Sequence, residues 1–141
     1  MRIYLASRWN NPCQKALVEL LRGHGFDVYD YHQSIDPSRL SEVGHEHAEA
    51  KKGFVENSEA LQMCDVCVLV CPAGRESHLE LGVALGKGKN GYVLTSCPDD
   101  LELMYGLATD VYDNTASLLN ELYQYREDVE DGGSWDGGPN T

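Results

Sequence analysis

The sequence alternates short apolar runs with longer segments in which apolar residues recur at helical spacing. Apolar or alternating segments of strand length predict five strands, at residues 3–6, 26–31, 66–71, 91–95 and 110–112. Helical patterns lie between and after these strands, at residues 12–22, 51–63, 77–85, 98–105 and 115–125. Ser77 or the residue before it is expected to cap the third of these helices. Strands that alternate with helices predict an α/β fold, with a parallel sheet covered on both faces.

Two segments interrupt this alternation. Residues 32–50 are polar and predict a long loop with one short helix, a length at which loops often act as lids. Residues 127–141 are acidic and rich in glycine, and we expect a disordered tail there. The remaining residues, 1–126, are expected to form one domain, since 141 residues suffice for one ordinary core but not for two.

The charge of the chain is distributed unevenly. Eleven Lys and Arg against 23 Asp and Glu give a net charge of −12. Residues 1–98 carry 10 basic and 12 acidic residues, whereas residues 99–141 carry one basic and 11 acidic residues. This balance argues against binding to nucleic-acid polymers or anionic membranes, yet the first two thirds of the chain can still hold a site for a small anion.

The apolar runs and the cysteines indicate a compartment. No run approaches the roughly 20 apolar residues of a membrane helix, and Arg8 interrupts the N-terminal run too early for a signal peptide. Five cysteines, an odd number, suit reduced thiols better than a disulfide framework. We therefore expect a cytoplasmic protein.

Cysteines and histidines leave a metal site as an alternative. Cys64 and Cys67 are two residues apart, and His45 and His47 lie in the polar loop, but no complete four-ligand spacing is present. Cys67 belongs to an apolar strand, and free cysteine is among the most buried residue types. We expect buried thiols, no metal and no cofactor.

Two loops are the strongest candidates for a binding site. In open parallel sheets, ligands bind beyond the carboxyl ends of the strands, where the strand order reverses. The loops after the first and third strands supply hydroxyl, guanidinium and imidazole groups and a glycine that lets a ligand approach the backbone. These candidate binding residues are Ser7, Arg8, Gly74, Arg75, Ser77 and His78.

Glu80 is the candidate nucleophile. The pattern places Glu80 in the first turn of a helix, where backbone N–H groups and the helix dipole keep a carboxylate ionised. An ionised carboxylate is the form that attacks an electrophile, although helix capping by an acidic residue is the ordinary role of such a position. If the first and third strands are neighbours, the hydroxyl of Tyr4 lies beside Glu80.

Three segments carry a resemblance to a known family. They are Ile3-Tyr4-Leu5-Ala6-Ser7, the run from Cys64 to Val70 that includes Asp65, and the run from Gly74 to Lys89 that includes Glu80-Leu81-Gly82. In these segments the sequence resembles the nucleoside 2-deoxyribosyltransferase family, including relatives that hydrolyse nucleoside 5′-monophosphates. The similarity spans residues 1–125. It implies a flavodoxin-like, Rossmann-like three-layer sandwich with a five-stranded parallel sheet, and a role in nucleotide metabolism or salvage.

The resemblance also implies a mechanism. Glu80 would attack the anomeric carbon of the sugar, the base would leave, and a covalent glycosyl-enzyme would form. Water or a second base would then release the sugar with net retention, as in a retaining glycosidase. Tyr4 matches the family tyrosine that orients the glutamate.

One position departs from the family pattern. The family usually has an aspartate eight residues before the one that opens the third strand, and Asn57 stands there in this chain. An asparagine can hydrogen-bond a base, but it cannot act as acid or base. Glu56 or Glu59 could substitute, or another residue or solvent could protonate the leaving group.

Two functions therefore remain open. The first is cleavage or transfer of the N-glycosidic bond of a 2′-deoxynucleoside or its 5′-monophosphate, with Tyr4, Asn57 and Glu80 as catalytic residues; Ser7, Arg8 and Arg75 favour the nucleotide. The second is a non-catalytic module that binds or senses nucleotides, which Asn57 favours. By analogy with the family, we expect a homodimer or higher homo-oligomer.

Overall fold

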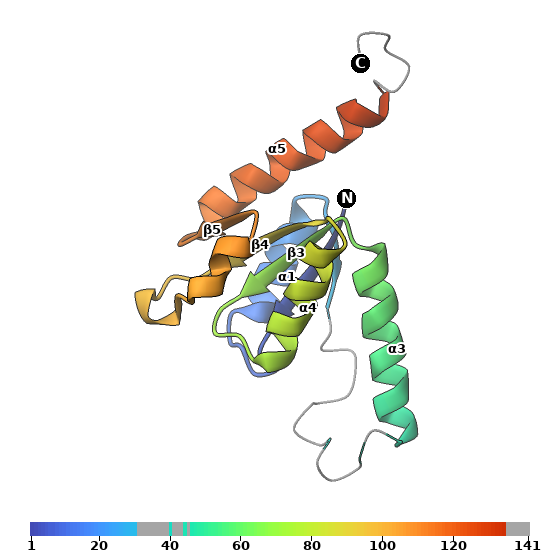
Figure 1. The fold of residues 1–141 in the computed structure, drawn as a ribbon. Coiled ribbons are helices and arrows are strands. Elements are labelled where there is room, and N and C mark those ends of the chain that lie inside the picture. Colours follow the sequence, from blue (N-terminus) through green and yellow to red (C-terminus); the bar gives the residue numbers. More distant parts are fainter. Residues whose placement is uncertain (31–39, 41–43, 45, 135–141) are drawn as a thin grey trace.

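A five-stranded parallel sheet forms the centre of the protein (Figure 1). The computed structural model describes residues 1–30, 40, 44 and 46–134. The strands are β1 (Arg2–Ser7), β2 (Asp27–Tyr29), β3 (Val66–Val70), β4 (Asn90–Leu94) and β5 (Asp110–Tyr112). Their order is β2-β1-β3-β4-β5, and every neighbouring pair is parallel. This is the flavodoxin-like order, so the predicted fold class is confirmed, and the order reverses between β1 and β3.

Helices cover both faces of the sheet and make the predicted three layers (Figure 1). Within the described residues the helices are α1 (Gln14–Gly23), α3 (Ala48–Met63), α4 (Arg75–Gly86) and α5 (Thr115–Ser134). Two short 3-10 helices, η3 (Pro98–Asp100) and η4 (Leu103–Leu107), connect β4 to β5. Apolar side chains of α1 and α5 pack on one face of the sheet, and those of α3 and α4 pack on the other. None of the helices in the described ranges is long and apolar enough to cross a membrane.

Alternate residues of β1 show how the two cores divide. Ile3 and Leu5 pack toward α1 and α5, whereas Tyr4 and Ala6 pack toward α3 and α4. All residues of β3 are buried, as its continuous apolar run predicts for a central parallel strand. Cys67 within β3 and Cys64 just before it are both buried, so the expectation of buried thiols is confirmed.

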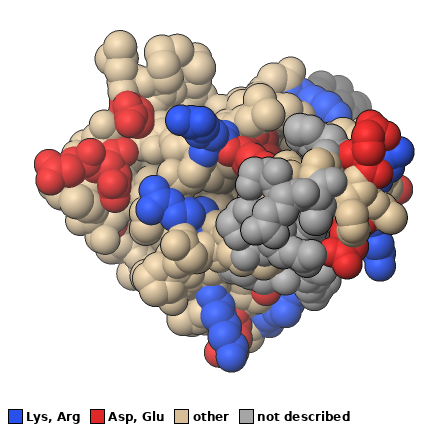
Figure 2. Space-filling view, turned by 90° about the horizontal axis from the view of Figure 1, so that it is seen from below, with Lys and Arg blue, Asp and Glu red and all other residues tan. Residues whose placement is uncertain are grey.

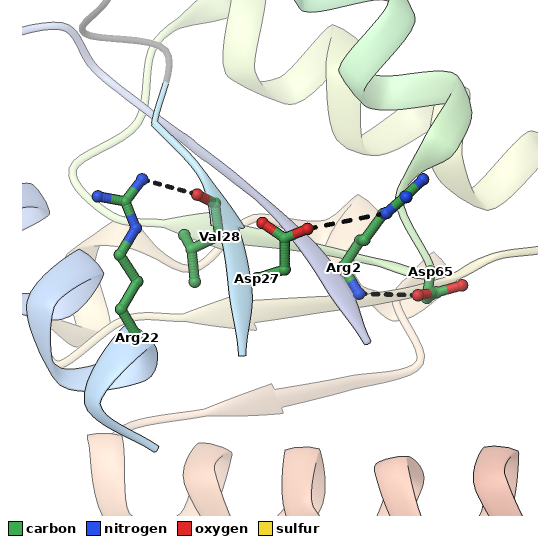
Figure 3. A network of polar contacts seen from close by, with 5 residues as sticks. All are labelled: Arg2, Arg22, Asp27, Val28 and Asp65. Carbon is green, nitrogen blue, oxygen red and sulfur yellow. Dashed lines mark hydrogen bonds and ion pairs between the residues drawn. The ribbon is translucent and has the colours of Figure 1, made fainter. Parts of the chain in front are cut away.

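Polar contacts tie the amino ends of the strands together (Figure 3). The backbone N–H of Arg2 donates to the carboxylate of Asp65 over 2.7 Å, and the Arg2 guanidinium lies 3.8 Å from Asp27. The guanidinium of Arg22 donates to the carbonyl of Val28 over 2.9 Å. Asp65, one of the motif residues, therefore joins β1 to β3 at the edge of the sheet opposite the carboxyl ends.

Several helix boundaries differ from the predicted ones, and those of α3, α4 and α5 differ most clearly. α3 begins at Ala48, because the ring of His47 caps it by accepting from the N–H of Glu49. α4 begins at Arg75 and is capped by Gly74, so the prediction of a cap at Ser77 or the residue before it is wrong. α5 continues to Ser134 rather than ending near residue 125, where its apolar pattern stops (Figure 1).

Candidate functional site

A cavity of about 750 Å³ opens at the carboxyl edge of the sheet. It lies between the loops that follow β1 and β3 and the facing sides of α3 and α4, beside the reversal of strand order. Seven predicted site residues line it: Ser7, Arg8, Asn57, Gly74, Arg75, Ser77 and Glu80. The topological rule therefore located this cavity correctly from the two loops.

Glu80 and Tyr4 form the central contact of the site. Tyr4 is completely buried in β1, and its hydroxyl donates to Oε2 of Glu80, while Glu80 also lines the cavity. Because β1 and β3 are neighbours, the predicted pairing of these two residues is confirmed. Burial raises the pKa of the Tyr4 hydroxyl far above its usual range, so Tyr4 remains a hydrogen-bond donor at every physiological pH.

The ionisation of Glu80 differs from the prediction. Burial raises the pKa of Glu80 to about 7; the hydrogen bond from Tyr4 lowers it and the charge of Glu76 raises it. With Gly74 as the cap, Glu80 lies in the second turn of α4, beyond the first turn in which the helix dipole acts most strongly. Desolvation therefore outweighs the expected stabilisation of the carboxylate, and the group titrates near neutrality.

Tyr29 connects Asn57 to this centre. The Tyr29 hydroxyl donates to Oδ1 of Asn57 over 2.7 Å, and its ring stacks on Tyr4 with centroids 5.4 Å apart and planes inclined by 19°. Tyr4 and Tyr29 are partners in the register of β1 and β2, which places the rings side by side. Sequence reasoning missed Tyr29, since the register of two strands cannot be read from their separate patterns.

Short polar contacts hold the loops of the cavity. The Ser77 hydroxyl accepts from the N–H of Gly74 over 2.8 Å and donates to its carbonyl over 2.9 Å. The buried side chain of Asn11 donates to the carbonyls of Val70 and Pro72, which joins the loop after β1 to the loop after β3. Ser77 therefore shapes the loop, and Asn11 is a positioning residue that the sequence pattern did not single out.

His78 lies outside the cavity, contrary to its prediction as a binding residue. Its Nδ1 donates to the carbonyl of Gly74 over 2.6 Å, and its Nε2 lies 2.8 Å from the hydroxyl of Tyr105. The imidazole and the Tyr105 ring stack with centroids 5.7 Å apart. Two residues correspond to roughly 200° around a helix, so His78 and Glu80 point to different sides of α4.

One wall of the cavity is mainly apolar, with Asn57, Ser58 and Gln62 as the polar residues of α3. Ala50, Gly53, Phe54, Asn57 and Leu61 share one side of α3, and Leu79 and Val83 face them from α4. Phe54 is 72% exposed and Leu79 is 70% exposed, although both belong to the apolar patterns that predicted their helices. A helical apolar pattern looks the same whether it faces a core or a cavity, so the sequence alone could not separate the two.

Charged side chains also line the cavity. Arg8, Arg75 and Lys87 line the cavity together with Glu76 and Glu80. Figure 2 views the molecule from below Figure 1 and shows Lys and Arg side chains beside an acidic patch in the middle of this face. This arrangement brings carboxyl groups together with cationic side chains of the kind that bind an anionic ligand.

The histidines and cysteines of the alternative metal site do not come together in the described ranges. His47 caps α3, His45 falls outside the described residues, and the remaining cysteines are unpaired thiols. Among the residues that the structure describes, no group of three or more His, Cys, Asp or Glu side chains is arranged to hold a metal ion.

Comparison with solved structures identifies proteins of the same fold. The 2-deoxyribosyltransferase of Bacillus psychrosaccharolyticus superposes with a TM-score of 0.65 at 20% identity, over 81% of this chain and 87% of that one. A conserved protein of Enterococcus faecalis gives a TM-score of 0.67 at 17% identity, over 89% of this chain and 98% of that one. The CMP N-glycosidase BcmB of Clostridium botulinum gives 0.53 at 19% identity, over 89% and 99%.

The comparisons based on sequence find no such relative. No protein-family model and no curated protein matches the chain. The resemblance inferred from the motifs therefore agrees with the comparison of three-dimensional structures. The chain has the fold of a 2-deoxyribosyltransferase and of a CMP N-glycosidase.

Proposed function

We propose that the protein cleaves or transfers the N-glycosidic bond of a 2′-deoxynucleoside or its 5′-monophosphate, with Glu80 as nucleophile. The observation that carries this proposal is a partly buried carboxyl group that lines a cavity at the strand-order reversal and accepts a hydrogen bond from a buried tyrosine. Two proteins of the same fold, a 2-deoxyribosyltransferase and a CMP N-glycosidase, support the reaction class.

The reaction proceeds in two displacements. Tyr4 holds Oε2 of Glu80, so Oε1 attacks the anomeric carbon; the C–N bond breaks and its electron pair leaves with the base. A glycosyl ester on Glu80 results. Water or a second base then attacks the same carbon, loses a proton to solvent, and returns Glu80 to its carboxylate form with net retention at the sugar.

The two parts of the cavity suit the two parts of a nucleotide. The apolar wall of α3 and α4 offers Phe54 and Leu79 to a planar base. Arg8, just after β1, and Arg75, at the start of α4, offer guanidinium groups to a phosphate, whereas the Ser7 hydroxyl already donates to Gln14 over 2.8 Å. We therefore favour the 5′-monophosphate over the free nucleoside.

An Arg75→Ala variant tests the choice of the monophosphate. Removal of the guanidinium lowers kcat/KM for a 2′-deoxynucleoside 5′-monophosphate by roughly tenfold or more, because a charge-assisted contact to phosphate is lost. The same change leaves kcat/KM for the corresponding nucleoside within about twofold. Equal losses for both substrates would show that Arg75 does not contact the phosphate.

Release of free base tests the reaction itself. The four 2′-deoxynucleosides and their monophosphates are incubated with the protein, with and without an acceptor base, and the products are separated by chromatography. The proposal expects base release by the natural chain and a loss of at least about 1000-fold in Glu80→Gln, which keeps the shape but removes the nucleophile. Exchange of bases without free sugar indicates transfer, and free sugar indicates hydrolysis.

A binding or sensing role is the second candidate. Asn57 favours it, because an amide cannot protonate the departing base. Tight binding of a nucleotide by the natural chain, with no base release from any substrate, would establish this role.

For either function we propose a homo-oligomer in the cytoplasm, to be tested by light scattering and by localisation of the tagged protein.

A further inference from the structure

We propose that Tyr29 is a positioning residue that fixes the Asn57 amide as a hydrogen-bond donor to the base. This inference rests on the proposed function and adds which protein group contacts the departing base in the cavity. The base departs as an anion stabilised by an N–H donor, with no proton transferred from residue 57. The group recognised is a hydrogen-bond acceptor of the base, either a carbonyl oxygen or an unprotonated ring nitrogen.

The orientation of the amide follows from its partner. The Tyr29 hydroxyl donates to Asn57 Oδ1 over 2.7 Å. Among the described residues, Oδ1 is the sole hydrogen-bond acceptor for this hydroxyl, and Nδ2 of Asn57 has no protein acceptor. A reversed amide would donate to the Tyr29 oxygen and leave the hydroxyl proton with no protein acceptor among the described residues. The arrangement with Oδ1 toward Tyr29 satisfies both groups, so the NH₂ group is the part that remains for a ligand.

The surroundings of Asn57 place this donor where a base binds. Asn57 lies between Phe54 and Leu61 on the side of α3 that lines the cavity, and the apolar side chain of Leu79 lines it from α4. Ser58 and Gln62 are the other polar residues of α3 that line the cavity. Among these three, Asn57 is held by a side-chain hydrogen bond, so its amide can orient a planar ligand through one directed hydrogen bond. Glu80 lines the same cavity, so nucleophile and donor serve one ligand.

Tyr29 is itself held firmly by the centre of the site. Its ring stacks on Tyr4, and Tyr4 donates to Glu80. The two hydrogen bonds and the stack form one continuous chain from the nucleophile to the base donor. Burial, followed by the charges of Glu56 and Glu80, raises the pKa of the Tyr29 hydroxyl, which keeps it protonated as a donor.

The chemistry fits a leaving group that carries negative charge. When the C–N bond breaks, its electron pair delocalises from the glycosidic nitrogen onto the acceptors of the base. A fixed N–H donor stabilises this charge more than it stabilises the neutral base, which lowers the barrier without an acid. An asparagine with a fixed orientation can thus perform part of the task that a protonated aspartate would perform.

The experiment measures dissociation constants of free cytosine, thymine, adenine and guanine by calorimetry at pH 8. Tyr29→Phe keeps the stacked ring and removes the hydroxyl, and we expect about three- to tenfold weaker binding of the base that binds best. Asn57→Leu weakens binding at least as much, and the double variant is no weaker than Asn57→Leu, because Tyr29 acts through Asn57. Tyr92→Phe, which removes a tyrosine hydroxyl bonded to Glu121, leaves binding unchanged.

A fourth variant separates the donor from general packing. Asn57→Asp has the same size and still accepts from Tyr29, but as a carboxylate it offers no N–H, so it weakens base binding as Asn57→Leu does. Unchanged binding in Tyr29→Phe or in Asn57→Asp overturns the inference, and so do additive losses in the double variant. If the natural chain binds none of the four bases, the result contradicts the proposed function itself, because the cavity then has no site for a base.

Discussion

Removal of the Tyr4 hydroxyl should move the acid limb of the pH–activity profile. Tyr4→Phe keeps the buried ring and its stack on Tyr29 and deletes the hydrogen bond to Oε2 of Glu80. Burial raises the pKa of Glu80 and that bond lowers it, and together with the charge of Glu76 they bring it to about 7. Without the bond, burial and the charge of Glu76 remain, and both favour the neutral acid, so the carboxylate forms at higher pH.

The size of the change follows from the energy of the bond. A hydrogen bond to a charged group contributes about 1.5–3 kcal/mol, and 1.36 kcal/mol corresponds to one pH unit. The acid limb of kcat/KM therefore moves up by about one to two pH units. At pH 6 the Glu80 carboxyl of the natural chain is already mostly protonated. There, kcat/KM of Tyr4→Phe is lower than that of the natural chain by about 10- to 100-fold, and this loss shrinks toward pH 10.

The assay is base release from the best substrate, measured as kcat/KM from pH 5 to pH 10. The kcat/KM profile reports the ionisation of the free enzyme, so substrate binding does not shift its acid limb. Tyr92→Phe, which loses a hydroxyl on the other face of the sheet, serves as the matched control. An acid limb that stays near pH 7 in Tyr4→Phe, with a uniform loss at every pH, would refute the role of Tyr4 in the ionisation of Glu80.

Three further predictions concern stability, each measured as the free energy of unfolding in urea. Because the pKa of Glu80 is raised from 4.5 to about 7, this carboxyl lowers the stability of the fold progressively as pH rises from 4.5 to 7; Glu80→Gln is more stable than the natural chain at pH 9, by at most about 3 kcal/mol, and the gap closes below about pH 4. Lys89 donates to three carbonyls at the end of α3, so Lys89→Met loses about 1 kcal/mol, whereas the exposed Lys52→Met changes little. A methyl group on buried Gly91 would meet leucine side chains of α4 at 2.7 and 2.8 Å, so Gly91→Ala costs about 1–3 kcal/mol, while Gly82→Ala, with open space on α4, gains up to about 1 kcal/mol.

Alternation of strands and helices was enough to predict the fold and the edge of the sheet that holds the site. The apolar run at residues 66–71 predicted a central strand, and the neighbouring first strand then brought Tyr4 beside Glu80. Both inferences rest on topology, which hydrophobic patterning determines strongly. The loops at Ser7 and Gly74 were found by the same rule.

Features that depend on register, helix phase and burial were not predictable in this way. The partnership of Tyr4 with Tyr29 depends on how β2 pairs with β1. His78 turned out to bond to Gly74 and Tyr105, because the orientation of each side chain around α4 follows from three-dimensional packing. The pKa of Glu80 depends on desolvation, which no local pattern contains.

A covalent glycosyl-enzyme on Glu80 is the central claim, and mass spectrometry of the intact protein tests it most directly. The protein is mixed with its best substrate, or with a 2-fluoro sugar analogue that slows the second displacement, and is quenched in acid. We expect a mass increase of one sugar unit from a nucleoside, or of one sugar phosphate unit from a 5′-monophosphate, located by proteolysis on the peptide that contains Glu80 and absent from Glu80→Gln. Base release without any adduct, or an adduct on another residue, would contradict it.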